Sequence, residues 1–366
     1  MTGMSYPTVD EDFLLRLLQA CAERAPLYPK QFAQESNLPR DLLDQGLDEL
    51  RRRGLIKLSD WVKDQGQGCV PTDAGLLALK TKRLTPAAST SAQASPTQAA
   101  GTYARGELVR AAVFAPRRGY VTRVLLAANV LYFLYGAFFA WQHDLPVNEY
   151  LAGDSRVCNL VLGELGGLWP PVTVPDAGVT ERRPEFERII LSFFLHIGIL
   201  HLLLNMYFLV MIGQLIETMW GSVRFLVIYF TAGIVGSCAV LLITHLEHLA
   251  PRDTPLTAGA SGCMFGLFAA LIVWFALNYQ HLPPNVIQAW SRNIAINLAL
   301  LVAINFVATV SWQGHLGGAL GGFLAALFLH VQRFNPSAAV RFLALLCVPL
   351  VPVGFFLAVL WQAGRL

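Results

Sequence analysis

The chain has 366 residues, and its 27 Lys+Arg and 24 Asp+Glu side chains leave a formal net charge of only +3. Charged residues make up 14% of the chain and hydrophobic residues 55%, whereas ordinary soluble domains are about 25% charged. A single soluble globule, a disordered chain and a coiled coil are therefore excluded, because so much apolar surface needs lipid to cover it. The charges gather in residues 1–80, which predicts a soluble domain followed by a membrane domain.

The N-terminal residues 1–80 are expected to form a small α+β domain. The expected elements are helices at 12–24 and 39–53, extended runs at 55–58 and 69–71 around a turn at 66–68, and a helix at 73–80 capped by Thr72. This order resembles a winged helix. Arg51, Arg52 and Arg53 could contact phosphates, but 10 basic against 12 acidic residues give no basic footprint, so a protein partner is favoured over DNA.

The start of the chain is acidic, at Asp10, Glu11 and Asp12, with no basic segment before an apolar one. We therefore expect no cleavable signal peptide and a cytoplasmic N-terminal domain. The six cysteines have neither paired nor metal-ligand spacing, so they predict no disulfide framework and no zinc site.

Residues 81–116 are rich in small and polar residues without periodicity, which predicts a flexible linker. Beyond them, seven stretches free of charged residues approach the roughly 20 residues that a helix needs to cross a bilayer. They lie at about 124–143, 191–216, 225–246, 257–277, 293–310, 314–332 and 342–361.

Basic residues near the ends of these spans predict the topology. Arg117, Arg118 and Arg123 precede the first span and should hold the N-terminus in the cytoplasm. The same topology also places Arg224, Arg292, Arg333 and Arg341 on the cytoplasmic side. An odd number of spans then leaves the C-terminus outside. Every even-numbered span begins at the outer surface.

Four polar side chains lie near the starts of even-numbered spans: His201 and Asn205 on the second, Ser261 on the fourth and His315 on the sixth. Polar groups at membrane depth are costly and are therefore candidate functional residues. All four should lie toward one leaflet. A serine hydroxyl becomes a nucleophile when a neighbouring base takes its proton, and His315 is an available imidazole.

Donors for an oxyanion are also available. His201 and Asn205 are four residues apart and share one side of a helix, whereas His196 lies some 140° away and is expected to make a structural hydrogen bond. A helix start at Ser261 would add free backbone N–H groups.

Each of these residues has an ordinary packing explanation when it is taken alone. A small residue in a membrane helix usually packs, and Gly318 with Gly322 is typical of helix–helix contact. The combination of a serine, a histidine and an i,i+4 His/Asn pair at one end of alternating spans has few packing explanations.

These motifs resemble those of the rhomboid family of intramembrane serine proteases. The motifs are His-x4-His-x3-Asn (His196, His201, Asn205), Gly-x-Ser-Gly (Gly259 to Gly262), His-x2-Gly-x3-Gly (His315, Gly318, Gly322) and Gly-x3-Glu (Gly213, Glu217). The resemblance covers about residues 120–332. It implies a helical polytopic membrane protein with a six-helix core at 117–335 and an additional C-terminal helix at 336–366. The linker at 81–116 and the winged-helix-like domain at 1–80 lie outside this resemblance.

The resemblance also implies the role of each residue. Ser261 would be the nucleophile and His315 the general base and acid, with His201, Asn205 and the Ser261 backbone as the oxyanion hole. Residues with implied structural roles are His196, Gly213, Glu217, Gly259, Gly262, Phe265, Gly318 and Gly322. Phe265 stands where many members have a tyrosine, and the Trp-Arg pair common in the outer loop is not visible, although Trp169 lies there.

The implied reaction is cleavage of transmembrane protein substrates near their outer end, after a small residue, without metal, ATP or cofactor. The implied location is the inner membrane of a bacterium. Three alternatives stay open. They are a catalytically silent binding protein of the same fold, a membrane-tethered regulator acting through residues 1–80, and a transporter or proton relay that uses intramembrane His and Asn.

Overall fold

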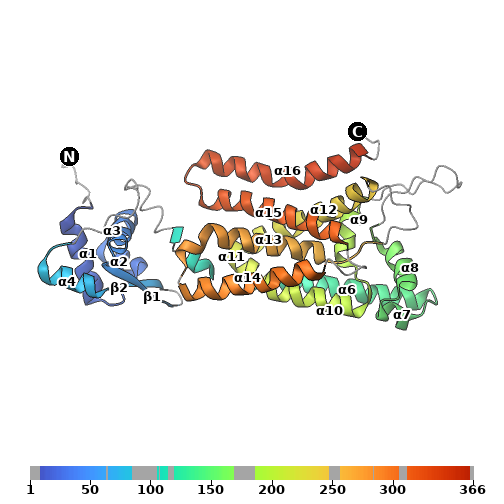
Figure 1. Cartoon of the computed structure of the whole chain (residues 1–366), viewed down its shortest axis with the longest axis horizontal. Helices are drawn as coiled ribbons and strands as arrows, with labels where there is room; N and C mark the ends of the chain where they lie inside the picture. The colour runs from blue at the N-terminus through green and yellow to red at the C-terminus, as the bar shows by residue number, and fades with distance from the viewer. Residues whose placement is uncertain are drawn as a thin grey trace. The chain divides into compact units, whose positions relative to one another are not determined.

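The computed structural model describes residues 9–62, 65–84, 105–106, 108–113, 119–168, 186–246, 256–282, 284–304 and 311–362. The chain forms two compact units, residues 1–116 and residues 117–366. Figure 1 labels the helices and strands of both units.

The N-terminal unit is built around one apolar core. Its elements are α1 (Glu11–Glu23), α2 (Pro29–Ser36), α3 (Arg40–Arg52), β1 (Ile56–Val62), β2 (Gly66–Pro71) and α4 (Asp73–Thr81). β1 and β2 are antiparallel, with Ile56 opposite Pro71. Leucines of α1 and α3 fill the core beside Cys21 and Cys69. Thr72 accepts a hydrogen bond from the Gly75 N–H at 3.1 Å, which confirms the predicted cap of α4.

Three details of this unit differ from the sequence prediction. The helix α2 was not predicted, because its eight residues contain little apolar periodicity and its start is marked mainly by Pro29. Gly66 and Gln67 were assigned to a turn but pair with β1. The buried Gln67 amide donates to the Ser59 carbonyl at 2.8 Å, which anchors this part of β2. Residues 105–106 and 108–113 are helical, so the predicted linker is shorter than expected.

The membrane unit contains seven helices that are long and apolar enough to cross a membrane, among the described residues. The spans are α6 (Tyr120–Gln142), α10 (Gly198–Phe208) continuing through a π-helical turn (Leu209–Gly213) into α11 (Gln214–Trp220), α12 (Ser222–Leu246), α13 (Ser261–Asn278), α14 (Pro284–Ile304), α15 (Trp312–Phe334) and α16 (Ala338–Gln362). Three short helices, α7 (Val147–Ala152), α8 (Ser155–Leu165) and α9 (Arg188–Leu191), lie between the first two spans. The seven predicted spans are therefore confirmed in number.

Several span boundaries differ from the prediction. The second span begins at Gly198 rather than near 191, because Leu195 is extended and Gly198 has a φ of +74°. The fifth helix begins at Pro284, which lacks the N–H that a first helical residue does not need. Arg292 therefore lies within α14 instead of before it. Residues 305–310 of the predicted fifth span lie outside the described residues.

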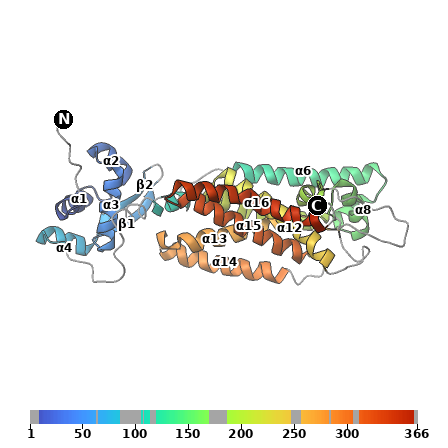
Figure 2. The same ribbon diagram turned by 90° about the horizontal axis from the view of Figure 1, so that it is seen from above.

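Glycines set the close packing at the centre of the membrane unit. In the most apolar 18-residue stretch of the third span 67% of the residues are buried, against 6% in that of the fifth, so α12 is central and α14 peripheral. Seen from above, α6 and α14 lie at opposite edges of the unit (Figure 2). A Cβ on Gly266 of α13 would lie 2.1 Å from the Ala232 Cβ of α12, and one on Gly322 of α15 would lie 2.3 Å from the Gly266 Cα. Only glycine permits backbones to approach this closely.

Candidate active site

Ser261 and His315 lie at the first turns of two adjacent, parallel helices. α13 begins at Ser261 itself, and α15 begins at Trp312 with the Ser311 hydroxyl accepting from the Gly314 N–H at 3.4 Å. The His315 Nε2 lies 2.8 Å from the Ser261 Oγ, a hydrogen-bonding distance. The Phe265 ring is stacked on the His315 ring, with centroids 4.0 Å apart and planes 13° apart. His315 is buried and Ser261 half-buried, so the hydroxyl can still be approached.

Two glycine contacts explain why these helices come so close. A Cβ on Gly318 would lie 2.1 Å from the Gly262 carbonyl oxygen, and a Cβ on Gly262 would lie 3.2 Å from the Gly314 carbonyl oxygen. Both contacts lie within one turn of the Ser261–His315 pair. The glycines predicted to pack a neighbouring helix therefore bring α13 and α15 together at the site.

The segment before Ser261 is held by backbone hydrogen bonds. Leu168 and Thr257 form an antiparallel bridge, with N–H to carbonyl distances of 2.9 and 3.0 Å, and the Gly259 N–H donates to the Ser192 carbonyl at 2.8 Å. Residues from three separate parts of the chain thus meet here. Thr257 is outside the helix, which corrects the predicted start of the fourth span.

His201 lies directly against this segment. A Cβ on Gly259 would be 2.7 Å from the His201 Cε1, and Gly259 has a φ of +127°, so both space and backbone conformation require glycine there. The Ile197 N–H donates to the His201 Nδ1 at 3.2 Å, so in the neutral ring the proton lies on Nε2. The Nε2–H of His201 is thus a hydrogen-bond donor beside Gly259, two residues before Ser261 in the chain.

Asn205 lies one turn further along α10 and is buried. Its side-chain amide donates to the His201 backbone carbonyl at 2.9 Å, which fixes the amide on the helix face that carries His201. An amide nitrogen has two protons, so one remains for a second acceptor.

His196 lies buried beside the site. It lies before α10, and its ring is fully buried beside that of His201, with centroids 5.3 Å apart. Within the described residues no other side chain hydrogen-bonds to its ring nitrogens, and its polar partner is the Phe194 backbone. The planes of the two histidine rings are 59° apart.

Glu217 ties the end of the second span to the start of the first. Its carboxylate accepts from the N–H groups of Val121 and Thr122 at 3.1 and 2.9 Å, from the Thr122 hydroxyl at 2.8 Å and from the Ser222 hydroxyl at 2.7 Å. Carboxylates are favoured at helix N-termini, where N–H groups are free. A Cβ on Gly213, one turn earlier, would lie 3.1 Å from the Thr122 methyl group, so this glycine makes room for the contact.

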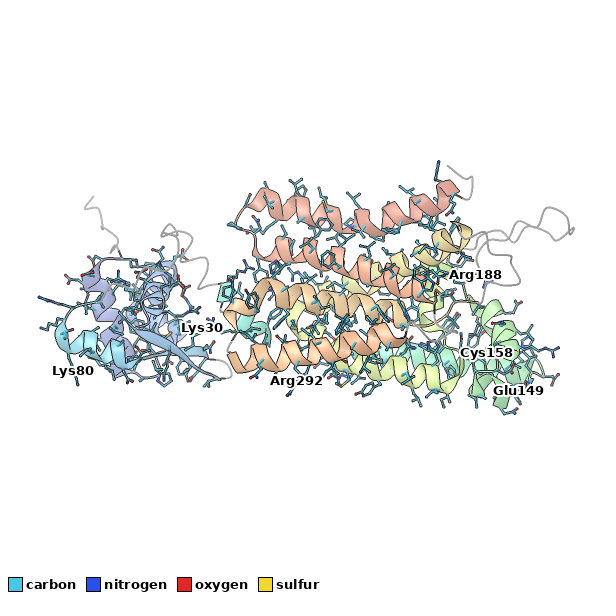
Figure 3. All side chains as sticks on the ribbon, in the orientation of Figure 1. Lys30, Lys80, Glu149, Cys158, Arg188 and Arg292 are labelled. Carbon is cyan, nitrogen blue, oxygen red and sulfur yellow. The ribbon has the colours of Figure 1, made fainter. Side chains whose placement is uncertain are left out.

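Arg188 contributes to the site and was missed by the sequence reasoning. Its Nη1 donates to the Gly163 and Gly167 carbonyls at 2.6 and 3.0 Å, which anchors the chain immediately before Leu168. Figure 3 shows Arg188 at the same end of the membrane unit as Cys158 of α8. The available signal was a lone arginine directly before an apolar stretch. Arg188 does not belong to the Trp-Arg pair common in the family, since Glu187 precedes it, and Trp169 lies outside the described residues.

In the part of the chain that the structure describes, no three His, Cys, Asp or Glu side chains are grouped so that they could hold a metal ion. The polar residues gathered at the starts of α10, α13 and α15 are those of a serine, two imidazoles and an amide. That set suits acyl transfer.

Comparisons with known proteins agree with this arrangement. The Rhomboid domain model matches residues 183–332, which contain His201, Asn205, Ser261 and His315. Over 150 residues the chain is 31% identical to the putative rhomboid protease YdcA of Bacillus subtilis (strain 168), covering 41% of this chain and 69% of that protein. The chain belongs to the rhomboid family. It is a multi-pass integral membrane protein.

Two other rhomboid relatives are longer than the shared region. The rhomboid protease GluP of Bacillus subtilis (strain 168) is 34% identical over 225 residues, which are 59% of this chain and 41% of GluP. Rhomboid-like protease 3 of Toxoplasma gondii is 33% identical over 138 residues, which are 38% of this chain and 49% of that protein. The chain thus spans less than half the length of these two relatives. The rhomboid domain match leaves residues 1–182 outside it.

Proposed function

We propose that this rhomboid is an active intramembrane serine endopeptidase in which Ser261 is the nucleophile and His315 the general base. The observation that carries the proposal is the 2.8 Å separation of the Ser261 Oγ and the His315 Nε2. His315 would take the hydroxyl proton as Oγ attacks the scissile carbonyl carbon. It would then give that proton to the leaving amine, and water would hydrolyse the acyl-enzyme by the same route. Phe265 would hold the imidazole in plane against the serine.

The oxyanion of the tetrahedral intermediate needs donors that are already in position. We assign this role to the His201 Nε2–H, the Asn205 side-chain amide and the Ser261 backbone N–H. The first turn of α13 supports the third donor, because its N–H groups have no partner within the helix. His201 is held against Gly259 and oriented by the Ile197 N–H, which supports the first.

Rhomboid proteases cleave transmembrane substrates. For this chain we propose a substrate with one transmembrane segment, cut near its outer end after a small residue. We also place the protein in a bacterial inner membrane, with the N-terminus in the cytoplasm and the C-terminus outside. A reporter enzyme active only outside the cytoplasm, fused after residue 366, should then be active. If the reporter is inactive although the protein is inserted in the membrane, the C-terminus lies in the cytoplasm and the proposed topology is wrong.

The activity test uses the purified full chain in detergent and a model single-span substrate with an alanine-containing, helix-weakening site. We expect cleavage by the parent and none by Ser261→Ala or His315→Ala. Ser291→Ala, on the exposed side of α14, is the matched control and should cleave as the parent does. If the parent cleaves nothing while a known relative does so in the same lipid, the silent binding protein becomes the better explanation.

For the N-terminal unit we propose a winged-helix-like module that binds a protein rather than DNA. The Arg52 and Arg53 side chains of the helix that would face DNA are ion-paired with Asp48, Glu49 and Glu11. Leu77 of α4 is 62% exposed and offers an apolar contact. Mixing the full chain with duplex DNA at low salt should show no binding. Binding that weakens steeply with salt would support the membrane-tethered regulator.

A further inference from the structure

A second polar pair joins the two helices that carry Ser261 and His315. Asn278 and His330, near the other ends of α13 and α15, are both buried, at 0% and 6% exposure. The Asn278 Nδ2 lies 3.1 Å and its Oδ1 3.3 Å from the His330 Nε2. The same Nδ2 donates to the Trp274 carbonyl at 2.7 Å, which fixes the amide on its own helix. This pair takes no part in the chemistry proposed above.

The Asn278–His330 pair lies at the opposite ends of α13 and α15 from Ser261 and His315. Asn278 follows Ser261 by 17 residues, and His330 follows His315 by 15. At about 1.5 Å per residue, each polar residue lies roughly 25 Å from the catalytic end of its helix. α13 and α15 are therefore joined by a side-chain hydrogen bond at each end.

In the half of the contact next to Ser261 and His315, the two backbones meet at glycines. Gly262 and Gly266 of α13 lie against Gly318 and Gly322 of α15, backbone on backbone. Glycine faces allow close approach but have no side chains that interlock, so they resist sliding and rotation weakly. Lipid supplies no hydrophobic force that would select one register either. A buried, hydrogen-bonded polar pair can select it, as single polar residues do in coiled coils.

We propose that Asn278 and His330 set the register of α13 against α15 and thereby hold Ser261 and His315 at bonding distance. The proposal rests on the proposed protease function, in which these two residues are positioning residues. The tolerance is small, because the 2.8 Å Ser261–His315 bond is lost beyond about 3.5 Å. A slip of less than 1 Å along the glycine faces would break it.

The test replaces the pair by apolar residues in the double variant Asn278→Leu/His330→Leu. Apolar side chains of similar volume often keep or raise stability when they replace a buried polar pair. We expect an unchanged melting temperature and KM but a kcat at least tenfold lower. The exchanged pair Asn278→His/His330→Asn should recover most of the kcat. The control is Asn297→Leu on α14, whose amide donates to the Asn293 carbonyl of its own helix and whose loss should leave kcat unchanged.

A distance measurement separates failure of this proposal from failure of the proposed function. Spin labels at Ala276→Cys and Leu316→Cys, both exposed positions on α13 and α15, report the register whether or not the chain cleaves a substrate. Cys347→Ser removes the half-buried native thiol, since the other five cysteines are buried. We expect one narrow distance distribution in the parent and a shifted or broadened one in the double leucine variant. A distribution identical to that of the parent would overturn the proposal, whatever the activity.

Discussion

A methyl group added at Gly318 should separate the proposed catalytic pair. In Gly318→Ala the new Cβ would lie 2.1 Å from the Gly262 carbonyl oxygen, whereas ordinary contact begins at 3.4 Å. Because the obstacle is backbone, α15 must move away from α13 by up to about 1.3 Å, the difference between these distances. His315 lies three residues before Gly318 on the same helix and moves with it. The 2.8 Å bond to Ser261 then lengthens toward about 4 Å and is lost.

The expected loss of activity follows from that displacement. A misplacement of about 1 Å in a catalytic group costs on the order of 100-fold in rate, or roughly 2.7 kcal/mol in the activation barrier. We therefore expect Gly318→Ala to lower kcat/KM by about 100-fold in the single-span substrate assay. Overpacking should also lower the free energy of unfolding by about 1–3 kcal/mol.

The matched control is Gly354→Ala in α16, where an added Cβ has no atom within 4 Å. It makes the same substitution in a membrane helix and should leave cleavage unchanged. A serine-reactive fluorophosphonate gives a second readout, since it labels Ser261 only when a base activates it. If Gly318→Ala cleaves and is labelled within threefold of the parent, the glycine contact does not position the pair and the reasoning is wrong.

Three further changes test other parts of the chain. Glu217→Gln leaves some of the donors that the carboxylate now accepts unpaired, so the free energy of unfolding should fall by about 2–3 kcal/mol; thermal melting checks this, with the exposed Glu164→Gln as a control that should melt like the parent. Gly259→Ala should abolish cleavage without unfolding the protein, because its Cβ would lie 2.7 Å from the His201 Cε1; full activity would remove His201 from the proposed oxyanion hole. Burial raises the pKa of the Asp48 carboxyl above its usual range, so the folded unit binds the carboxyl proton more tightly than the unfolded chain does. The parent should therefore lose stability relative to Asp48→Asn as the pH rises from about 4 through the raised pKa. Calorimetry of the full chain that shows the same stability difference between the two proteins at every pH would contradict the shift.

The number of membrane helices and the residues of the candidate site could be predicted from sequence because each depends on local composition. A stretch of about 20 apolar residues has few alternatives to a membrane helix, since unpaired backbone groups are costly in lipid. Ser261, His201 and His315 stood out for the same reason, as polar groups at membrane depth. That these side chains lie close together was predicted from the topology, because all even-numbered spans begin at the same membrane surface, and not from any local signal.

Element boundaries and the anchors of the site could not be predicted in this way. The second span begins at Gly198 because that glycine lies against Gly153, a contact between segments 45 residues apart in sequence (153 to 198). Arg188 donates to the backbone carbonyls of Gly163 and Gly167, and every residue has such a carbonyl, so the sequence does not mark these two as acceptors. The packing of His196 against the His201 ring could not be predicted either, because it depends on how the segment before α10 folds back.

The sequence by itself determined that this is a seven-span membrane protein with a serine, two histidines and an asparagine near one leaflet, because hydropathy and spacing are properties of the chain. Only the tertiary structure decided that Ser261 and His315 are 2.8 Å apart and that Asn278 meets His330. Both distances depend on how closely two helix backbones approach. This close approach results from many glycine contacts between α12, α13 and α15. It cannot be predicted from any one segment, because each contact joins residues that are far apart in the sequence.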